Sequence, residues 1–167
     1  MQEACQARLA TAGFGQYEVS GYARTGRRCR HNLVYWQFGD YLGIGAGAHG
    51  KVTARDAGPE ITRTIRVRHP SVYMSAVDPT ARVVETRQVL VEELPFEFAL
   101  NVLRLNEGFA AADFEQRTGL PAGVLAEQLE LAIRRGLLEV TGPGWRPTSL
   151  GRRFLNDLQA LFLPAGQ

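Results

Sequence analysis

The feature that most constrains the fold is the order of helices and turns predicted for the second half of the chain. A first helix is expected from Pro95 to near Gly108, because apolar residues recur there at the i, i+3, i+4 and i+7 spacing of one helical face. The other expected elements are helices over 111–117 and 121–135, a hairpin over 137–147 around TGPG, and a last helix from the cap Thr148 to about residue 161. This order predicts a winged-helix-like helical domain over residues 89–167.

A winged helix raises the question of DNA binding. In helix-turn-helix proteins the second helix of the pair, here 121–135, enters the major groove. That helix has no lysine or arginine before Arg134, and residues 89–167 carry 7 basic and 10 acidic side chains, net −3. Phosphate contacts need positive charge, so we favour a packing role over a transcriptional one and expect no nucleic-acid partner. The inward residues of this helix are expected to be Val124, Leu125, Leu129, Ala132 and Ile133.

Composition excludes several other classes of protein. The chain has 167 residues, 45% hydrophobic and 22% charged, which suits one domain, or one domain with a small appendage. Its only cysteines, Cys5 and Cys29, provide neither a disulfide scaffold nor three thiolates for an iron–sulfur cluster. No run approaches eighteen apolar residues, so no membrane span is expected. The N-terminus lacks a signal-peptide pattern, which predicts a reducing, cytoplasmic location.

The first half of the chain differs from the second. Residues 1–88 carry 12 basic and 7 acidic side chains, net +5. The expected elements are a helix over 2–12 ended by Gly13, a strand over 16–20, a half-exposed strand over 61–68 and a short helix over 71–77. A helix followed by a strand is one unit of an α/β fold, here without a companion. We therefore predict an α+β chain divided into residues 1–88 and 89–167.

Glycines dominate the segment GDYLGIGAGAHG, residues 39–50. A strand this rich in glycine is weak, and is tolerated where a backbone or a ligand approaches closely. The spacing is not GxGxxG and no helix follows, so a dinucleotide site is not indicated. Both a tightly packed strand and a ligand-facing strand remain open, and His49 at its end is on its own more typical of a structural histidine.

His31 lies in HNLVYW, between a basic loop and an aromatic pair. A neutral imidazole is a good iron ligand, and Tyr35 and Trp36 offer flat surfaces on which a macrocycle can stack. Guanidinium groups pair with carboxylates, so the loop arginines would suit the same kind of ligand; they are Arg24, Arg27, Arg28 and Arg30. From the residues alone, a structural histidine beside core aromatics and a solvated basic loop is the favoured interpretation. Cys29 is a candidate thiolate, and no nucleophile–base pair stands out.

Several segments, in the right order, resemble the radical S-adenosylmethionine proteins related to oxygen-independent coproporphyrinogen III oxidase, and more narrowly their heme-chaperone branch. They are QYEVSGYARTGRRCRHNLVYWQFGDYLGIGAGAHGKV at 16–52, RHP at 68–70, PFEFALNVLRLNEGF at 95–109, and GLLEV with WRPTSLGRRFLNDL from 136 onward. The resemblance covers nearly the whole chain.

The resemblance implies a fold and two sets of site residues. It implies that residues 1–20 are the last helix–strand unit of a partial radical S-adenosylmethionine (β/α) barrel, followed by glycine-rich strands and the C-terminal winged-helix-like domain. It matches HNLVYW to the family's HNxxYW motif, which implies heme binding by His31, Asn32, Tyr35 and Trp36, with His31 as candidate iron ligand. It places S-adenosylmethionine contacts at Gly45, Gly47, Ala48 and His49.

One departure from the family pattern limits the predicted chemistry. The CxxxCxxC motif that binds the [4Fe–4S] cluster is absent, so this chain is expected to lack radical activity alone and to need a missing N-terminal barrel. The strand at 16–20 is then expected to have an unpaired edge. We predict the C-terminal part of a chaperone that binds heme and transfers it to acceptor proteins. The alternative is the corresponding part of a coproporphyrinogen III oxidase.

Overall fold

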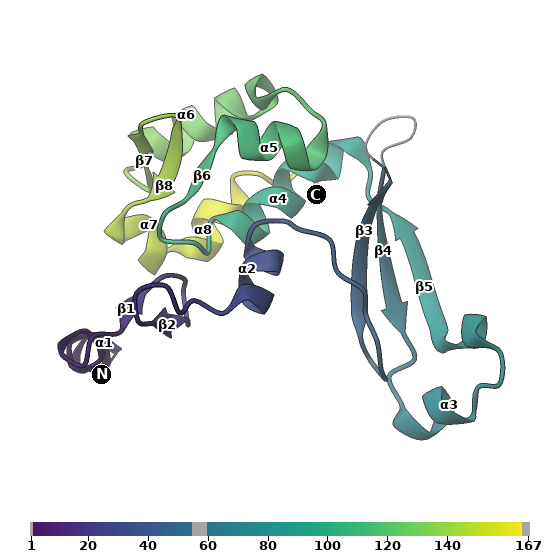
Figure 1. Cartoon of the computed structure of the whole chain (residues 1–167). Helices are drawn as coiled ribbons and strands as arrows, with labels where there is room; N and C mark the ends of the chain where they lie inside the picture. Colours follow the sequence, from purple (N-terminus) through teal and green to yellow (C-terminus); the bar gives the residue numbers. More distant parts are fainter. Residues whose placement is uncertain (1, 55–59, 165–167) are drawn as a thin grey trace.

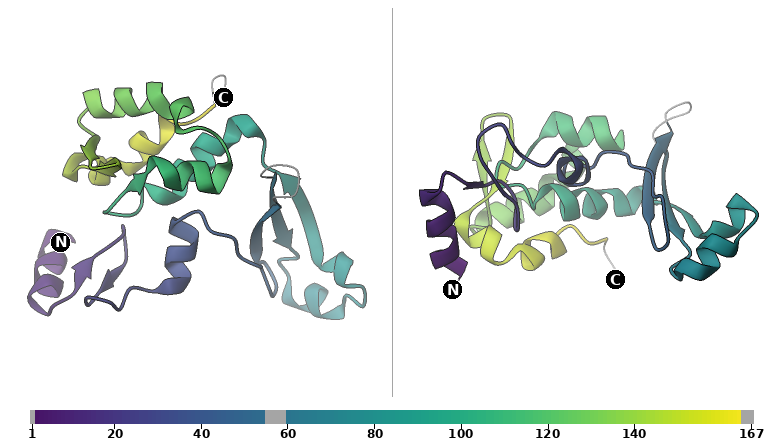
Figure 2. Two further views of the ribbon diagram at one scale, coloured as in Figure 1. Left: turned by 45° about the horizontal axis from the view of Figure 1, so that its top comes forward. Right: turned by 60° about the horizontal axis from the view of Figure 1, so that its bottom comes forward.

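The computed structural model describes residues 2–54 and 60–164. The helices of the second half form one body, a three-stranded sheet projects from it, and the N-terminal segment lies along another side (Figures 1 and 2). The elements of the first half are α1 (Gln2–Thr11), β1 (Gly15–Gln16), β2 (Tyr22–Ala23), α2 (Arg30–Trp36), β3 (His49–Ala54), β4 (Glu60–Arg66), α3 (Pro70–Ser75), the 3₁₀ turn η1 (Pro79–Arg82) and β5 (Val83–Gln88).

The second half follows the predicted order of elements. They are η2 (Val91–Glu93), α4 (Leu94–Val102), β6 (Phe109–Ala110), α5 (Ala111–Thr118), η3 (Ala122–Leu125), α6 (Ala126–Arg134), β7 (Leu138–Thr141), β8 (Gly144–Pro147), α7 (Ser149–Arg153) and α8 (Leu155–Ala160). The three helices, the hairpin and the Thr148 cap, whose hydroxyl accepts from the Gly151 N–H at 3.0 Å, are confirmed. The short strand β6, which pairs with β8, is an addition.

Several details of this half were predicted incorrectly. The first helix ends at Val102 rather than near Gly108, and Phe154 interrupts the last helix. Val124 and Ile133 are 44% and 37% exposed rather than inward. Residues 122–125 form a 3₁₀ turn instead of the first turn of an α-helix, and its tighter winding shifts which residues face the core.

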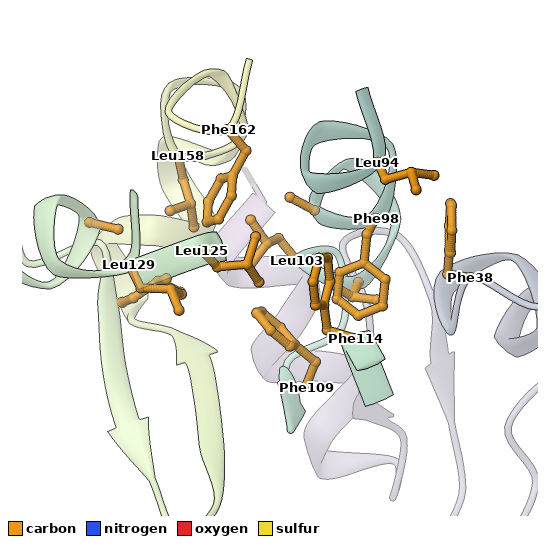
Figure 3. Packing of buried hydrophobic residues seen from close by; sticks show 14 of the residues in the cluster. Phe38, Leu94, Phe98, Leu103, Phe109, Phe114, Leu125, Leu129, Leu158 and Phe162 are labelled. Carbon is orange, nitrogen blue, oxygen red and sulfur yellow. The ribbon is translucent and has the colours of Figure 1, made fainter. Parts of the chain in front are cut away.

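Aromatic rings form the centre of the buried core of this body (Figure 3). Phe98 on α4 is 1% exposed, and its ring makes edge contacts with Phe38, Phe109 and Phe114 at centroid distances of 5.6, 5.2 and 5.1 Å. Leu125, Leu129, Leu158 and Phe162 extend the same cluster. Because Phe38 belongs to the first half of the chain, the core also holds the segment that follows α2.

The N-terminal segment forms α1 and its Gly13 cap, at φ 80°, as predicted, but not the strand over 16–20. The chain turns after β1 because the Glu18 carboxylate accepts hydrogen bonds from both the backbone N–H and the hydroxyl of Ser20. Glu18 also forms an antiparallel bridge with Leu105, and the carbonyl of Tyr17 accepts from the Asn106 N–H at 3.0 Å. The expected unpaired edge is therefore wrong, since this segment is docked on the loop after α4.

The projecting sheet is antiparallel in the order β3-β4-β5. The predicted strand over 61–68 and the helix over 71–77 correspond to β4 and α3, whereas β3 and β5 carried no predicted bounds. The glycine-rich segment was predicted as a strand, but residues 42–48 form a loop, with Gly45 at φ 107° and Gly47 at φ 70°. A Cβ at Gly43 would lie 2.3 Å from the carbonyl oxygen of His49, so close backbone packing explains that glycine.

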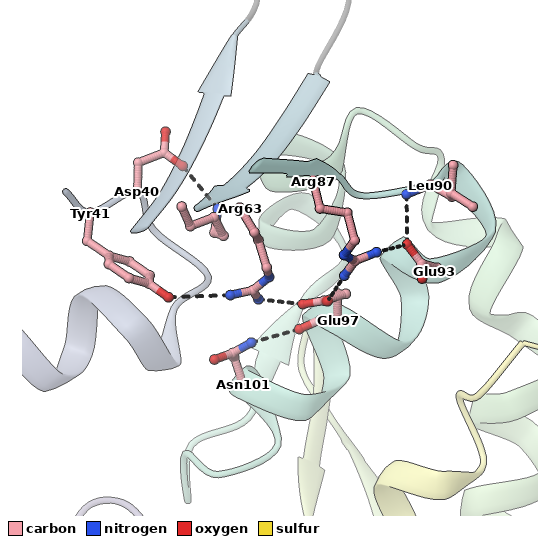
Figure 4. Close-up of polar contacts among 9 residues, drawn as sticks. Asp40, Tyr41, Arg63, Arg87, Leu90, Glu93, Glu97 and Asn101 are labelled. Atoms are coloured by element: carbon pink, nitrogen blue, oxygen red, sulfur yellow. Dashed lines mark hydrogen bonds and ion pairs between the residues drawn. The ribbon is translucent and has the colours of Figure 1, made fainter. Parts of the chain in front are cut away.

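Charged side chains attach this sheet to α4 (Figure 4). Arg63 on β4 donates to Glu97 on α4 and, at 3.3 Å, to the Tyr41 hydroxyl. Arg87 on β5 pairs with Glu93 at 2.5 Å and with Glu97 at 3.2 Å. The sheet and the helical body are thus joined by an ion-pair network next to the aromatic core.

Candidate functional site

The HNLVYW motif lies on helix α2, which spans Arg30–Trp36 and follows directly from the arginine-rich loop. The sequence predicted a loop over residues 21–32, and the helix was not predicted. On a helix, residues four apart share a face, so His31 lies beside Tyr35, and Asn32 beside Trp36. The helix separates the four motif residues into two faces.

The first face carries a histidine–tyrosine pair. His31 Nε2 lies 3.1 Å from Tyr35 Oη, and the two rings meet edge-on with centroids 4.8 Å apart. The imidazole is exposed and the phenol half-buried. Tyr41 supports the pair from the other side, since its ring meets that of Tyr35 edge-on at 4.4 Å. This face presents one nitrogen donor and one oxygen donor in contact with each other.

The second face points toward the helical body. The guanidinium of Arg104 lies over the Trp36 ring, 4.1 Å from its centroid, so one face of the indole is already covered. Arg104 also reaches the carboxylate of Glu18, which is 1% exposed, at 3.3 Å. Trp36 Nε1 is buried without a hydrogen-bond partner among the residues that the structure describes. The half-buried Asn32 completes the motif.

A buried lysine fixes the chain just after α2. Lys51 on β3 is 2% exposed; its ammonium lies 3.0 Å from Asp40 Oδ1 and 4.2 Å from the centroid of Phe38. Burial lowers the pKa of Lys51, against the opposing effect of Asp40. Burial acts to raise the pKa of Asp40, but hydrogen bonds from Thr53 and Lys51 outweigh it and hold that pKa below its usual value. Phe38 adopts a left-handed φ of 52° within this assembly.

The four loop arginines divide into two pairs. The guanidinium carbon of Arg24 lies 5.0 Å from the centroid of the Phe14 ring, and a guanidinium nitrogen of Arg28 lies 2.6 Å from a carboxylate oxygen of Glu107. Arg27 and Arg30 are exposed and have no acidic partner within residues 2–54 and 60–164. Two cations beside α2 are therefore available to an anionic ligand.

The second set of predicted residues lies elsewhere. Gly45, Gly47 and Ala48 belong to the loop before β3, and His49 begins β3 with an exposed side chain. The Gly45 N–H donates to the Tyr73 hydroxyl on α3 at 3.2 Å. This loop lies beside α3, whereas α2 lies beside α4, so the two predicted sets are not brought together (Figure 1).

The residues present fit a heme better than a metal cluster. An exposed imidazole and a half-buried phenol, with Arg27 and Arg30 nearby, are the kinds of group that hold heme iron and carboxylates. No group of three or more His, Cys, Asp or Glu side chains that could hold a metal ion occurs in the described part of the chain, and Cys5 and Cys29 are both free and exposed. A [4Fe–4S] cluster therefore has no ligand set among these residues.

Among the described helices, none has the length and apolar character that a membrane span requires.

Sequence reasoning missed three residues that shape this site. Arg104 covers Trp36, Tyr41 supports Tyr35, and Lys51 fixes the turn after α2. Tyr41 and Lys51 lie on either side of the loop 42–48, and their backbones pair with each other. No local pattern marks Arg104, because its partners lie about 70 and 86 residues earlier in the sequence.

Comparison with known proteins shows which proteins the chain is similar to. Residues 90–154 match the HemN C-terminal domain. The chain is 46% identical to the heme chaperone HemW of Escherichia coli and 41% identical to that of Haemophilus influenzae, in each case over 93% of this chain and 39% of the relative. It therefore spans about two fifths of the length of these relatives.

A solved structure gives the same fold. The coproporphyrinogen III oxidase HemN from Escherichia coli, described as a radical SAM enzyme, matches with a TM-score of 0.65 over 96% of this chain and 39% of that one. The sequence identity is 18%, so this match supports the fold alone. The mixed α/β architecture is that of part of the HemN fold.

Proposed function

Since the chain belongs to the family of the HemW heme chaperones and carries a HemN C-terminal domain, we propose that it is the part of such a chaperone that binds heme. The observation that carries this proposal is the contact between the exposed His31 and the half-buried Tyr35 of HNLVYW on α2, beside Arg27 and Arg30, which have no acidic partner among the described residues. Heme is an iron macrocycle with two propionates, so it requires an axial donor and cations together.

The proposed arrangement uses both faces of α2. Heme iron would be bound on the face of His31 and Tyr35, with His31 the ligand that the family resemblance implies. Arg27 and Arg30 would pair with the propionates. Asn32 and Trp36 would border the macrocycle. Bound heme would supply no radical chemistry here; its exposure at the surface suits transfer to an acceptor protein.

We propose that the remaining family features also hold for this chain. Gly45, Gly47, Ala48 and His49 would contact S-adenosylmethionine, and a [4Fe–4S] cluster would be held by an N-terminal barrel that packs against residues 1–88. The chain would work in the cytoplasm, and no nucleic acid would be involved. A winged-helix-like unit over 89–167 is supported by the sheet β6-β8-β7 packed with α4, α5 and α6.

A second candidate is part of a coproporphyrinogen III oxidase. The similarity to the HemN fold favours it. The higher identity to proteins named heme chaperones, together with the candidate iron donors His31 and Tyr35 on α2, favours the chaperone. The two functions differ in ligand, because a chaperone site should require iron whereas an oxidase substrate carries none.

Absorbance titrations of the chain with hemin and with iron-free protoporphyrin test this proposal. We expect a saturable Soret shift with hemin, weakened by about tenfold or more in His31→Ala, which corresponds to about 1.4 kcal/mol. His69→Ala, at an exposed histidine before α3, is the matched control and should bind like the wild type. Hemin should then pass to added apomyoglobin. Equal binding of both porphyrins would favour the oxidase, and no saturable binding would refute both.

A further inference from the structure

We infer that the iron-binding atom of this site is Tyr35 Oη, with His31 as its hydrogen-bond partner rather than as the ligand. This inference rests on the proposed binding of heme and assigns the atoms that perform it. The observation behind it is the 3.1 Å contact between Tyr35 Oη and His31 Nε2.

That contact occupies Nε2, the imidazole nitrogen farther from the main chain. In either tautomer Nε2 is engaged with the phenol, as acceptor or as donor, so iron cannot bind Nε2 unless the hydrogen bond breaks. The other nitrogen, Nδ1, adjoins the carbon that joins the ring to the main chain, so iron there would press the macrocycle against α2. The phenol oxygen keeps a free lone pair at the far end of a longer side chain.

The protein also holds this oxygen in place. The Tyr35 ring packs edge-on against Tyr41 at 4.4 Å, and the Tyr41 hydroxyl accepts from Arg63 at 3.3 Å, which in turn donates to Glu97 on α4. The phenol is thus connected through two side chains to the helical body. Within residues 2–54 and 60–164 the imidazole of His31 has no side-chain hydrogen bond or ring contact other than those with Tyr35, and it is exposed.

The chemistry of ferric iron fits this assignment. Tyrosine oxygen serves as an axial heme ligand in other proteins. Binding of ferric iron to Tyr35 Oη would displace the phenol proton, which His31 Nε2 is placed to accept: the O–H bond would break, an N–H bond would form, and the phenolate oxygen would bind iron. Return of that proton from the imidazolium to the oxygen would release the iron. No oxidant or reductant is needed in either direction, and the reversible exchange suits a protein that must give heme away.

Resonance Raman spectra of the hemin complex, made with ring-deuterated tyrosine, test the assignment. We expect an isotope-sensitive iron–phenolate band in the wild type that is absent in Tyr35→Phe and retained in His31→Ala. His31→Ala should hold hemin more weakly and release it faster to apomyoglobin. Tyr22→Phe, at a half-buried tyrosine of β2, is the matched control and should keep the band. Far-UV circular dichroism would show that each variant is folded; phenylalanine preserves the ring packing with Tyr41.

The possible outcomes separate the two proposals. A wild type that binds hemin without a phenolate band, and loses its axial ligand in His31→Ala, would overturn the assignment to Tyr35 while leaving heme binding intact. A band that persists in Tyr35→Phe would overturn it as well. Failure of the wild type to bind hemin at all would instead refute the proposed function from which the inference starts.

Discussion

The helical body, residues 94–162, and the N-terminal segment, residues 2–36, are held in place by different forces. The body encloses a continuous apolar cluster centred on Phe98. The segment contributes few buried side chains, and it is attached by polar contacts to residues 104–107, among them Glu18 with Arg104 and Arg28 with Glu107. The proposed heme site belongs to the polar region.

This difference suggests that stability and function depend on different parts of the molecule. Apolar burial is non-directional and scales with area, so a packed helical body tolerates changes at its surface. A segment held by a few directed contacts can be displaced locally at a cost below that of global unfolding. A surface that must accept and then give up a large ligand is suited to the second kind of attachment.

Phe98→Ala tests the core with the largest expected effect. The side chain is 1% exposed and contacts three other aromatic rings, so its removal leaves a cavity and should lower the free energy of unfolding by about 3–5 kcal/mol. Leu100→Ala, on the same helix but 41% exposed, should cost far less. Urea unfolding followed by circular dichroism measures both. Equal losses in the two variants would mean that α4 is not the centre of the core.

The helical body could be predicted from the sequence, whereas much of the first half could not. Apolar periodicity and caps such as Thr148 and Gly119 are local, and they gave the right order of elements. The turn at Glu18 depends on its carboxylate and on Leu105, some 87 residues later, and no local pattern contains that partner. The glycine-rich segment was predicted as a strand because glycines alternate there with apolar residues, and this pattern does not show that Gly45 and Gly47 have positive φ values.

Two glycines with the same backbone angle compare the regions directly. Gly108, in the body, and Gly26, in the arginine loop, both have φ 72°. A Cβ at Gly108 would lie 1.9 Å from the carbonyl oxygen of Trp145, whereas one at Gly26 meets no atom within 4 Å. Gly26→Ala should cost only the strain of a left-handed alanine, about 1–2 kcal/mol, and Gly108→Ala about 3 kcal/mol or more. Thermal unfolding of both variants checks this, and similar melting temperatures would contradict it.

Arg104→Met tests the polar attachment. The variant keeps a long side chain over Trp36 but leaves the buried Glu18 carboxylate without its cation, a loss of about 1–3 kcal/mol. We expect hydrogen exchange to accelerate in residues 15–23 while the amides of α4 and α6 stay protected. Arg134→Met, at an exposed pair with Glu130, is the control and should change neither region. Loss of protection throughout α4 would mean that the segment and the body unfold as one unit.

The residues of the candidate site were predictable and their arrangement was not. HNLVYW named His31 and Tyr35 by resemblance, but only the helix brings Nε2 and Oη to 3.1 Å and turns Trp36 toward Arg104. The two unpaired arginines could not be told from their neighbours, because the partners of Arg24 and Arg28 are Phe14 and Glu107. Such pairing depends on tertiary contacts that the local sequence does not encode.

Glu93→Gln tests whether charge also contributes where the sheet meets the body, with the smallest expected effect. The backbone N–H of Leu90 and the guanidinium of Arg87 hold the pKa of Glu93 below its usual value, against the opposing effect of burial. A carboxyl whose pKa is lowered on folding stabilises the fold above its unfolded pKa and loses that stabilisation as the pH falls through the folded value.

In Glu93→Gln the glutamine oxygen can still accept from the Leu90 N–H, so the variant removes mainly the charge. We expect a deficit of about 0.5–1 kcal/mol at pH 7 that disappears below the folded pKa and shrinks in high salt. Urea unfolding at pH 7 and at pH 3 measures it. A deficit of the same size at both values would show that Glu93 acts through its shape, and that the sheet, like the helical body, is held by packing rather than by charge.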